Sequence, residues 1–349
     1  MKSRSTSRFI DWGSASRSAR SVGGPGPKVT PDQRAALTKD FQFAVERSEE
    51  LVTAFTSLPG PANRTRAWVM GRGGWADANL RSLERVIGPL IDRLLSTQPS
   101  RKAWRAKALG TQLGGLLGYV SRKVVGQYDV FLPADDEGLL YFVGPNVVAI
   151  ERKLAFDRMD FRTWVAMHEV THRVQFAAAP WLRGYLAGMV DAYLATVDID
   201  AKKMVDNLQR AAREMAERGE WRNVSVVLAM MTPEQIAIFH RMQSMMSLLE
   251  GHASFVMNQL GKEHLSTFDR LQRGLKERRN VGGMEKTFQR VIGFDQKVKQ
   301  YGAGEHFVAG VVQEAGMSGL NAVWSGPGTL PAMEEIAEPS RWLARVRPG

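Results

Sequence analysis

The sequence predicts a mainly α fold with a small β-hairpin. Three observations support this prediction. Apolar residues recur at helical spacing over most of the chain, and several of these segments begin with a capping residue followed by proline. In addition, only one pair of segments has the composition of two strands joined by a turn. We therefore expect several amphipathic helices around a core, with little sheet.

The first half of the chain contains three predicted helices. Thr30 and Pro31 are typical of a helix cap followed by proline at the first helical position. The helix that they begin should extend to about Leu58, where a Pro-Gly-Pro sequence ends it. Apolar spacing predicts two more helices, at about 80–94 and 99–117. The glycines at the end of the latter permit either close packing or a break.

A predicted β-hairpin follows these helices. Residues 128–132 and 139–143 are rich in aromatic and β-branched residues, and a polar segment with proline and glycine separates them. Helices are expected again from Asn146 onward. Asp160 is a candidate cap for the next helix, and Thr232 followed by proline and a glutamine at the capping-box position predicts a long helix to about Leu260.

Composition indicates a globular protein with one large domain. The chain has 349 residues, of which 44% are hydrophobic and 24% charged. Residues 1–30, rich in Ser, Arg, Gly and Pro, are expected to form a weakly ordered basic arm, and 31–349 a single domain. No apolar run has the length of a membrane span, and no signal-peptide core is evident, so a cytoplasmic location is expected.

Two further features of the composition restrict the function. The chain has no cysteine, so metal ligands must be His, Asp or Glu. The formal net charge is +11, which is compatible with an acidic partner. The basic residues are spread over several helices and no nucleic-acid recognition motif is present. We therefore interpret them as solvated surfaces and expect no specific binding of nucleic acid.

The residues His168-Glu169-Val170-Thr171-His172 form the pattern H-E-x-x-H, a signature of zinc metallopeptidases. Four residues make slightly more than one helical turn, so His168 and His172 project from the same face and can bind one Zn²⁺. Glu169 lies about 100° around the helix, where its carboxylate can act as general base toward a water activated by zinc. The alternative is an exposed helix with two unrelated histidines. Apolar flanking residues argue against it.

A third ligand is required, because a catalytic zinc generally has three protein ligands and one open position. Glu250 is the preferred candidate, since it falls on an expected apolar stripe of Met242, Met246, Leu249, Ala253 and Met257. His252 is the competing candidate. Residues two apart on a helix point about 200° apart, so both cannot face one metal. If Glu250 is the ligand, His252 is expected to be a hydrogen-bonded structural histidine. The alternative is a residue that lies behind the ligands and contacts one of them, or one that contacts the oxyanion of the transition state.

Several segments together resemble a known family. They are Leu140–Ile150, Trp164–Phe176, Pro180–Leu182, Leu249–Met257, Lys299–Tyr301, Val323–Trp324 and Leu330–Pro331. They resemble the zincin-like metallopeptidase family, a bacterial group catalogued as a domain of unknown function and associated in places with deazaflavin coenzyme biosynthesis. The resemblance runs from Asp11 to the C-terminus. It implies a mostly helical zinc hydrolase whose substrate is not established.

In this family resemblance, His168, Glu169 and His172 correspond directly to the metal motif, and Glu250 matches the acidic residue of a downstream E-G-H motif. The Ser- and Arg-rich start and His306 depart from the family pattern. We thus predict a multi-helix zincin-like domain that hydrolyses a peptide or another amide, with Tyr301, His252 or an arginine stabilising the oxyanion. Two alternatives stay open. One is a non-catalytic, metal-containing binding protein with a basic docking surface, and the other a zinc hydrolase of a non-peptide substrate.

Overall fold

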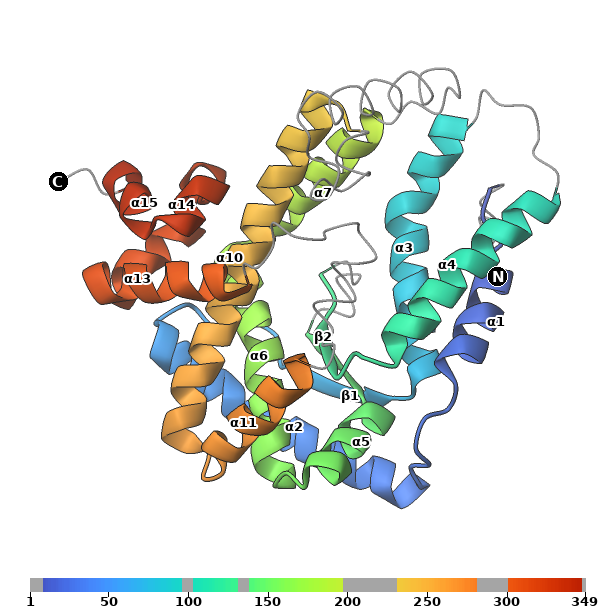
Figure 1. Ribbon diagram of the computed structural model, residues 1–349, viewed down its shortest axis with the longest axis horizontal. Coiled ribbons are helices and arrows are strands. Elements are labelled where there is room, and N and C mark those ends of the chain that lie inside the picture. The colour runs from blue at the N-terminus through green and yellow to red at the C-terminus, as the bar shows by residue number, and fades with distance from the viewer. Residues whose placement is uncertain (1–8, 96–102, 131–137, 197–230, 281–300, 347–349) are drawn as a thin grey trace. The chain divides into compact units, whose positions relative to one another are not determined.

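The computed structural model describes residues 9–95, 103–130, 138–196, 231–280 and 301–346 (Figure 1). It confirms the mainly α fold, with one small three-stranded sheet in this part of the chain. The contacts divide the chain into two compact units. The first unit comprises residues 1–48, 63–170 and 265–280, and the second comprises 49–62, 171–264 and 281–349. The single domain expected over 31–349 stays a prediction.

The first unit contains helices and the sheet. Its helices are α1 (Trp12–Gly23), most of α2 (Pro31–Thr56), α3 (Arg72–Leu95), α4 (Ala103–Ser121), α5 (Gly144–Leu154), the first part of α6 (Arg158–Ala178) and α11 (Phe268–Asn280). The capping expected at Thr30 is present. Gln33 N donates to Thr30 Oγ1 at 3.2 Å, and Thr30 N donates to the Gln33 side chain at 3.1 Å. Each of the two side chains thus accepts a hydrogen bond from a backbone N–H at the start of α2.

The sheet has the order β1-β3-β2. Strand β3 (Leu139–Val143) lies where it was predicted and pairs antiparallel with β2 (Gly126–Tyr128). The first strand of the hairpin was predicted at 128–132, but β2 begins at Gly126 and ends at Tyr128, so its predicted bounds were wrong. Residues 131–137 lie outside the described part. Strand β1 (Arg66–Met70) pairs parallel with β3 and was not predicted as a strand. The sheet is anchored to α2 by the rings of Phe41 and Phe142, which stack with centroids 3.9 Å apart.

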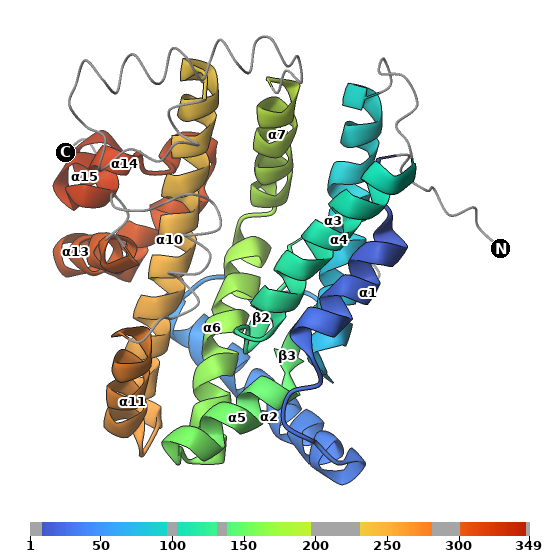
Figure 2. The same cartoon turned by 45° about the vertical axis from the view of Figure 1, so that its right-hand side comes forward.

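Helix α1 differs from the expectation of a weakly ordered arm over residues 1–30. Asp11 caps it by accepting a hydrogen bond from Ser14 N at 2.9 Å. Its buried face consists of small residues, Ala15 and Ala19, and packs along α4 (Figure 2). At Gly114 of α4, an added Cβ would lie 2.0 Å from the carbonyl oxygen of Ala15. The glycines of α4 therefore permit close packing, and this contact holds the helix in place. Residues 1–8 lie outside the described part.

The second unit is built around a long helix, α10 (Pro233–His264). Its other elements are the end of α2, the second part of α6, α7 (Trp181–Ala195), α13 (Tyr301–Leu320), α14 (Met333–Ala337), α15 (Pro339–Val346) and the 3₁₀ turns Asn321–Trp324 and Pro327–Thr329. Helix α13 crosses α10 (Figure 1). An added Cβ at Gly251 would lie 2.1 Å from the backbone of Gly304, so glycine on both helices permits this crossing.

The structure of α10 tests two sequence predictions, the capping box at its start and the apolar stripe along it. The capping box is confirmed: Gln235 N donates to Thr232 Oγ1 at 3.2 Å, and Thr232 N donates to Gln235 Oε1 at 2.9 Å. The apolar stripe is correct only in part. Leu249, Ala253 and Met257 are buried, whereas Met246 is 42% exposed. The buried face is instead extended by Met245 and Leu248, which come one position before Met246 and Leu249 and lie on the same side of the expected stripe.

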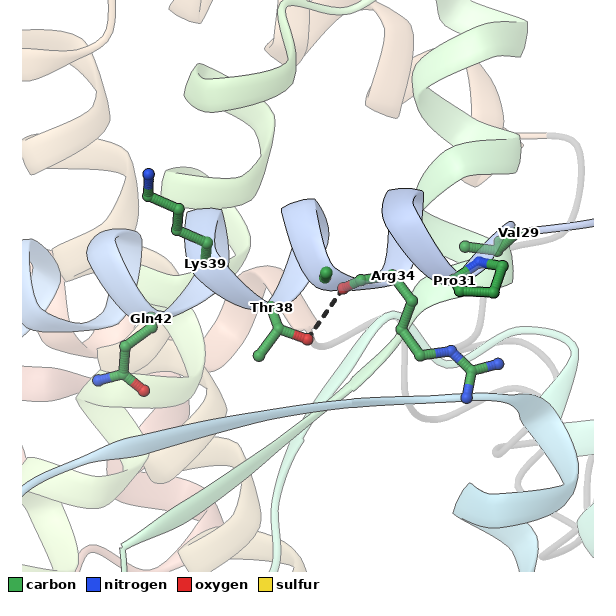
Figure 3. A pocket seen from close by; sticks show the side chains of 7 residues that line it. Val29, Pro31, Arg34, Thr38, Lys39 and Gln42 are labelled. Atoms are coloured by element: carbon green, nitrogen blue, oxygen red, sulfur yellow. Dashed lines mark hydrogen bonds between the residues drawn. The ribbon is translucent and has the colours of Figure 1, made fainter.

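Two other features of the described residues bear on function. None of the helices is long and apolar enough to cross a membrane. A hollow of about 780 Å³ runs along α2 and is lined by Val29, Pro31, Arg34, Ala35, Thr38, Lys39 and Gln42 (Figure 3). Within it, Thr38 Oγ1 donates a hydrogen bond to the carbonyl of Arg34 at 2.9 Å. None of the residues predicted for the metal site lines this hollow.

Candidate metal centre

Helix α6 carries the H-E-x-x-H motif, as the sequence predicts. Its first turn is capped by Asp157, whose carboxylate accepts a hydrogen bond from Asp160 N at 2.9 Å. Asp160, the expected cap, instead accepts hydrogen bonds from the backbone and side chain of Thr267 at 2.8 and 2.7 Å. The apolar side chains that flank the motif are buried, including Phe161, Val165, Met167 and Val174. The motif therefore lies on a helix that is anchored in the core.

The two histidines and Glu250 lie close together. His168 and His172 are one turn apart on α6, which is continuous, so the helix itself fixes their spacing. Within the second unit, His172 Nε2 lies 3.6 Å from Glu250 Oε1 on α10. One potential ligand atom from each of His168, His172 and Glu250 lies within 4.8 Å of the others. This is the set of three ligands that the sequence predicts.

This group fits a zinc ion. Two imidazole nitrogens and one carboxylate oxygen are ligands that zinc prefers, and three protein ligands leave a fourth position open. Ligand atoms about 2.0–2.1 Å from zinc at the tetrahedral angle lie roughly 3.4 Å apart. The 3.6 Å between His172 Nε2 and Glu250 Oε1 is close to that spacing. The side chains of these two residues are partly exposed, 12% and 27%, so a metal and a substrate can reach them.

Glu169 points to strand β2 rather than into the helical core. Its Oε2 accepts a hydrogen bond from the backbone N–H of Tyr128 at 2.9 Å. A Cβ added to Gly126 of the same strand would lie 2.7 Å from Glu169 Oε1. Glycine at position 126 therefore makes room for the carboxylate, and the strand backbone orients it. The residue is 7% exposed.

His252 is completely buried and lies behind the ligands. Its Nδ1 lies 2.9 Å from Nε2 of Gln175, and the Gln175 Oε1 lies 3.0 Å from Nδ1 of His172. Its ring meets Trp324 edge to face, with centroids 5.3 Å apart. Burial lowers the pKa of His252 to about 3, and the nearby His172 contributes to this shift to a smaller extent. Of the roles expected for His252, its burial and its contact with Gln175 fit a structural histidine or one that supports a ligand, rather than one that contacts an oxyanion.

Tyr301, the other oxyanion candidate, is the first residue of α13, and its side chain lies outside the described residues. Two features of the site were not predicted. One is the contact between Glu169 and β2, which joins segments 41 residues apart and has no local sequence signal. The other is Gln175. Its spacing of three residues after His172 places it on the same face of α6 and could have indicated a partner for that histidine.

Comparisons with known proteins agree with this geometry. A sequence profile described as zincin-like metallopeptidase matches residues 10–343, nearly the whole chain. The chain belongs to this family. Among solved structures, the zincin-like protein is similar to one from Chloroflexus aurantiacus described as a "putative hydrolase with a novel fold". The two are 32% identical with a TM-score of 0.74, over 97% of this chain and 100% of that one. Comparison with curated proteins gave no match.

Proposed function

We propose that this protein is a zinc-dependent hydrolase that cleaves peptide or other amide bonds. The observation that carries the proposal is the meeting of His168, His172 and Glu250 within 4.8 Å beside a buried, oriented Glu169. Membership of the zincin-like metallopeptidase family and the likeness to a protein described as a hydrolase support it.

The residues of the site have two different roles in the proposed mechanism, metal binding and proton transfer. His168, His172 and Glu250 would hold the metal, with the two histidines on one turn of α6 and the carboxylate on α10. When bound, zinc supplies a Lewis acid and lowers the pKa of a coordinated water toward ~7. Glu169 takes the proton from the attacking water and later returns it to the leaving amine. The backbone N–H of Tyr128 keeps this carboxylate in one orientation while the proton is transferred.

The position of Glu169 favours an enzyme over a non-catalytic metal protein. A purely structural site is completed by a fourth protein ligand and has no need of an adjacent base. Here Glu169 directly follows the ligand His168 in the sequence. Its carboxylate is hydrogen-bonded to strand β2 and is not turned to solvent. A hydrolase of a non-peptide substrate would use the same groups. Assays of hydrolysis with peptide and non-peptide substrates distinguish the two.

The test combines metal content with hydrolysis. Purified protein should contain about one zinc per chain by elemental analysis. His168→Ala, His172→Ala and Glu250→Ala should lose it, because each removes one of three ligands. Glu169→Gln should keep the metal and lose about 10²–10⁴-fold in the hydrolysis of a quenched-fluorescent peptide mixture, since only proton transfer is removed.

His240→Ala is a matched control, because His240 is an exposed histidine on the same helix as Glu250. It should keep both metal and activity. Full zinc occupancy in the His168→Ala and His172→Ala variants would contradict the proposal. Metal retained in Glu250→Ala but lost in His252→Ala would move the third ligand to His252.

A further inference from the structure

Gln175 is a buried amide that joins the two helices of the metal centre. It lies on α6, three residues after His172, and is 0% exposed. Its Oε1 lies 3.0 Å from His172 Nδ1. Its Nε2 lies 2.9 Å from the carbonyl oxygen of Leu249 and 2.9 Å from His252 Nδ1. Leu249 is adjacent to Glu250 on α10, and His252 is two residues further, so one amide contacts both sides of that ligand.

The carbonyl of Leu249 determines which end of the amide is which. A carbonyl oxygen only accepts hydrogen bonds, so the Gln175 atom beside it must be the NH₂ group. The same NH₂ group faces His252 Nδ1, which therefore accepts a hydrogen bond and carries no proton. The amide oxygen is consequently directed at His172. Two contacts with α10 thus fix the orientation of a side chain on α6.

This orientation fixes the tautomer of His172. An amide oxygen only accepts, so His172 Nδ1 must carry the proton that it donates to Gln175. In neutral His172 the lone pair is then on Nε2, the atom that lies 3.6 Å from Glu250 Oε1. Two electron-rich atoms face each other at that distance, and a cation between them stabilises the arrangement. These hydrogen bonds therefore leave the lone pair of His172 Nε2 available for a metal ion.

We propose that Gln175, held by Leu249 and His252, is a positioning residue that keeps His172 in the tautomer and orientation needed to bind the metal. The proposal rests on the proposed function, because it concerns the same metal centre. A metal-ligating histidine usually donates its other ring N–H to an acceptor, and removal of that acceptor typically lowers metal affinity 10–100-fold. Gln175 supplies this acceptor here, and His252 supports it from the other helix.

The experiment measures zinc affinity and the tautomer of His172 in the full-length protein. Gln175→Leu keeps the approximate size and removes every hydrogen bond of the amide. We expect zinc affinity, measured by competition with a chromophoric chelator, to fall about 10–100-fold. In metal-free protein with ¹⁵N-labelled histidine, NMR should show the proton of His172 on Nδ1 in the wild type and a shift toward Nε2 in the variant.

Two further variants separate positioning from stability. Val174→Ala removes a fully buried apolar group from the same helix and should lower the melting temperature while leaving zinc affinity unchanged. Gln175→Glu retains an oxygen that accepts from His172 in either protonation state, so its affinity should lie between those of the wild type and Gln175→Leu. A structural role alone would instead make affinity follow melting temperature across all three variants.

The outcomes distinguish this inference from the proposed function. Absence of zinc binding in the wild type would overturn the metal centre and the positioning role with it. Zinc bound by the wild type, with the same affinity and the same His172 tautomer in Gln175→Leu, would overturn only the positioning role. A fall in affinity for Val174→Ala as large as for Gln175→Leu would also overturn it, because stability would then account for both.

Discussion

The carboxylate of Glu169 is held by the backbone of Tyr128, with 2.9 Å between Tyr128 N and Glu169 Oε2. The general base in the proposed mechanism is therefore oriented by a strand as well as by its own helix. Val143 N donates to the carbonyl of Val125, so in this antiparallel register the N–H of Tyr128 is directed away from β3. The strand therefore contributes to the site without losing its pairing with β3. In the proposed mechanism, the position of β2 therefore determines where the carboxylate of Glu169 takes up the proton.

The first prediction concerns Gly126. In Gly126→Ala the new Cβ would lie 2.7 Å from Glu169 Oε1 and 2.8 Å from its Cγ, so the carboxylate must move. We expect hydrolysis to fall about 10²-fold or more, toward the effect of losing the general base, while zinc content stays near one per chain. Activity and elemental analysis of the purified variant check this prediction.

Gly71→Ala is its control, since nothing lies within 4 Å of a Cβ added there. It makes the same chemical change without a contact to Glu169 and should keep full activity. Normal hydrolysis by Gly126→Ala would show that the position of Glu169 beside β2 does not matter for catalysis.

The second prediction concerns the packing of α1 on α4. In Gly114→Ala the added Cβ would lie 2.0 Å from the carbonyl oxygen of Ala15, a backbone atom, so the two helices must move apart. We expect a loss of about 1–3 kcal/mol in the free energy of unfolding, measured by chemical denaturation. Gly88→Ala in α3, where the nearest atom lies at 4.0 Å, should instead raise stability by roughly 0.5–1 kcal/mol.

A related measurement removes residues 1–24. Their composition alone suggests that they are dispensable, but the structure places α1 among them, with Ala15 and Ala19 fully buried. The truncated protein, starting at Pro25, should therefore melt clearly below the full chain. Equal melting temperatures would show that the contact between α1 and α4 contributes little to stability.

The sequence predicts well what depends on periodicity. His168 and His172 share a face because their spacing matches one helical turn, and α10 begins at its capping threonine because the capping signal is local. Glu250 could be selected because a carboxylate beside an apolar stripe needs a partner. These inferences require only a helix and the chemistry of its side chains. The roles of the site residues themselves stay predictions until metal and activity are measured.

The sequence fails where a contact joins distant segments without a local signal. Strand β1 was missed because its parallel partner β3 begins 73 residues later, with no hairpin turn between them. Helix α1 was missed because it packs through alanines against glycines, whereas apolar patterning detects only larger side chains. The hydrogen bond from Tyr128 to Glu169 joins two such distant segments and could not be derived from the sequence. The contact of Gln175 with His172 spans only three residues, but the contacts of Gln175 with Leu249 and His252 on α10 have no local signal.

The third prediction concerns a buried ion pair behind the first part of α6. Arg162 Nε and Nη2 donate to the two carboxylate oxygens of Glu151 at 2.7 and 3.0 Å, and Arg162 also contacts Asp40. Arg162 and Glu151 are 5% and 6% exposed. Arg162→Met would leave the Glu151 charge buried without its partner, so we expect a loss of about 3–5 kcal/mol in the free energy of unfolding.

The matched control for this pair is Arg64→Met, since Arg64 forms an ion pair with Glu46 at the surface, with side chains 75% and 45% exposed. Its loss should be at most about 1 kcal/mol, because water replaces the interaction. Equal losses for the two variants would mean that burial does not determine the strength of these pairs.

The last prediction concerns the dependence of stability on pH at the C-terminal helices. Arg345 Nε and Nη2 donate to both carboxylate oxygens of Glu335 at 2.6 and 2.9 Å, and the hydrogen bonds from Arg345 hold the pKa of Glu335 below its usual 4.5. A lowered pKa in the folded state stabilises the protein above pH 4.5, and this contribution is lost as the pH falls through the folded pKa. Arg345→Met should therefore cost about 1 kcal/mol at pH 7, a value limited by solvent at the partly exposed arginine, and progressively less below pH 4.5. Denaturation of both proteins at pH 7 and pH 3 measures the difference, and a gap that is equal at both values would assign the loss to packing of the arginine stem rather than to its charge.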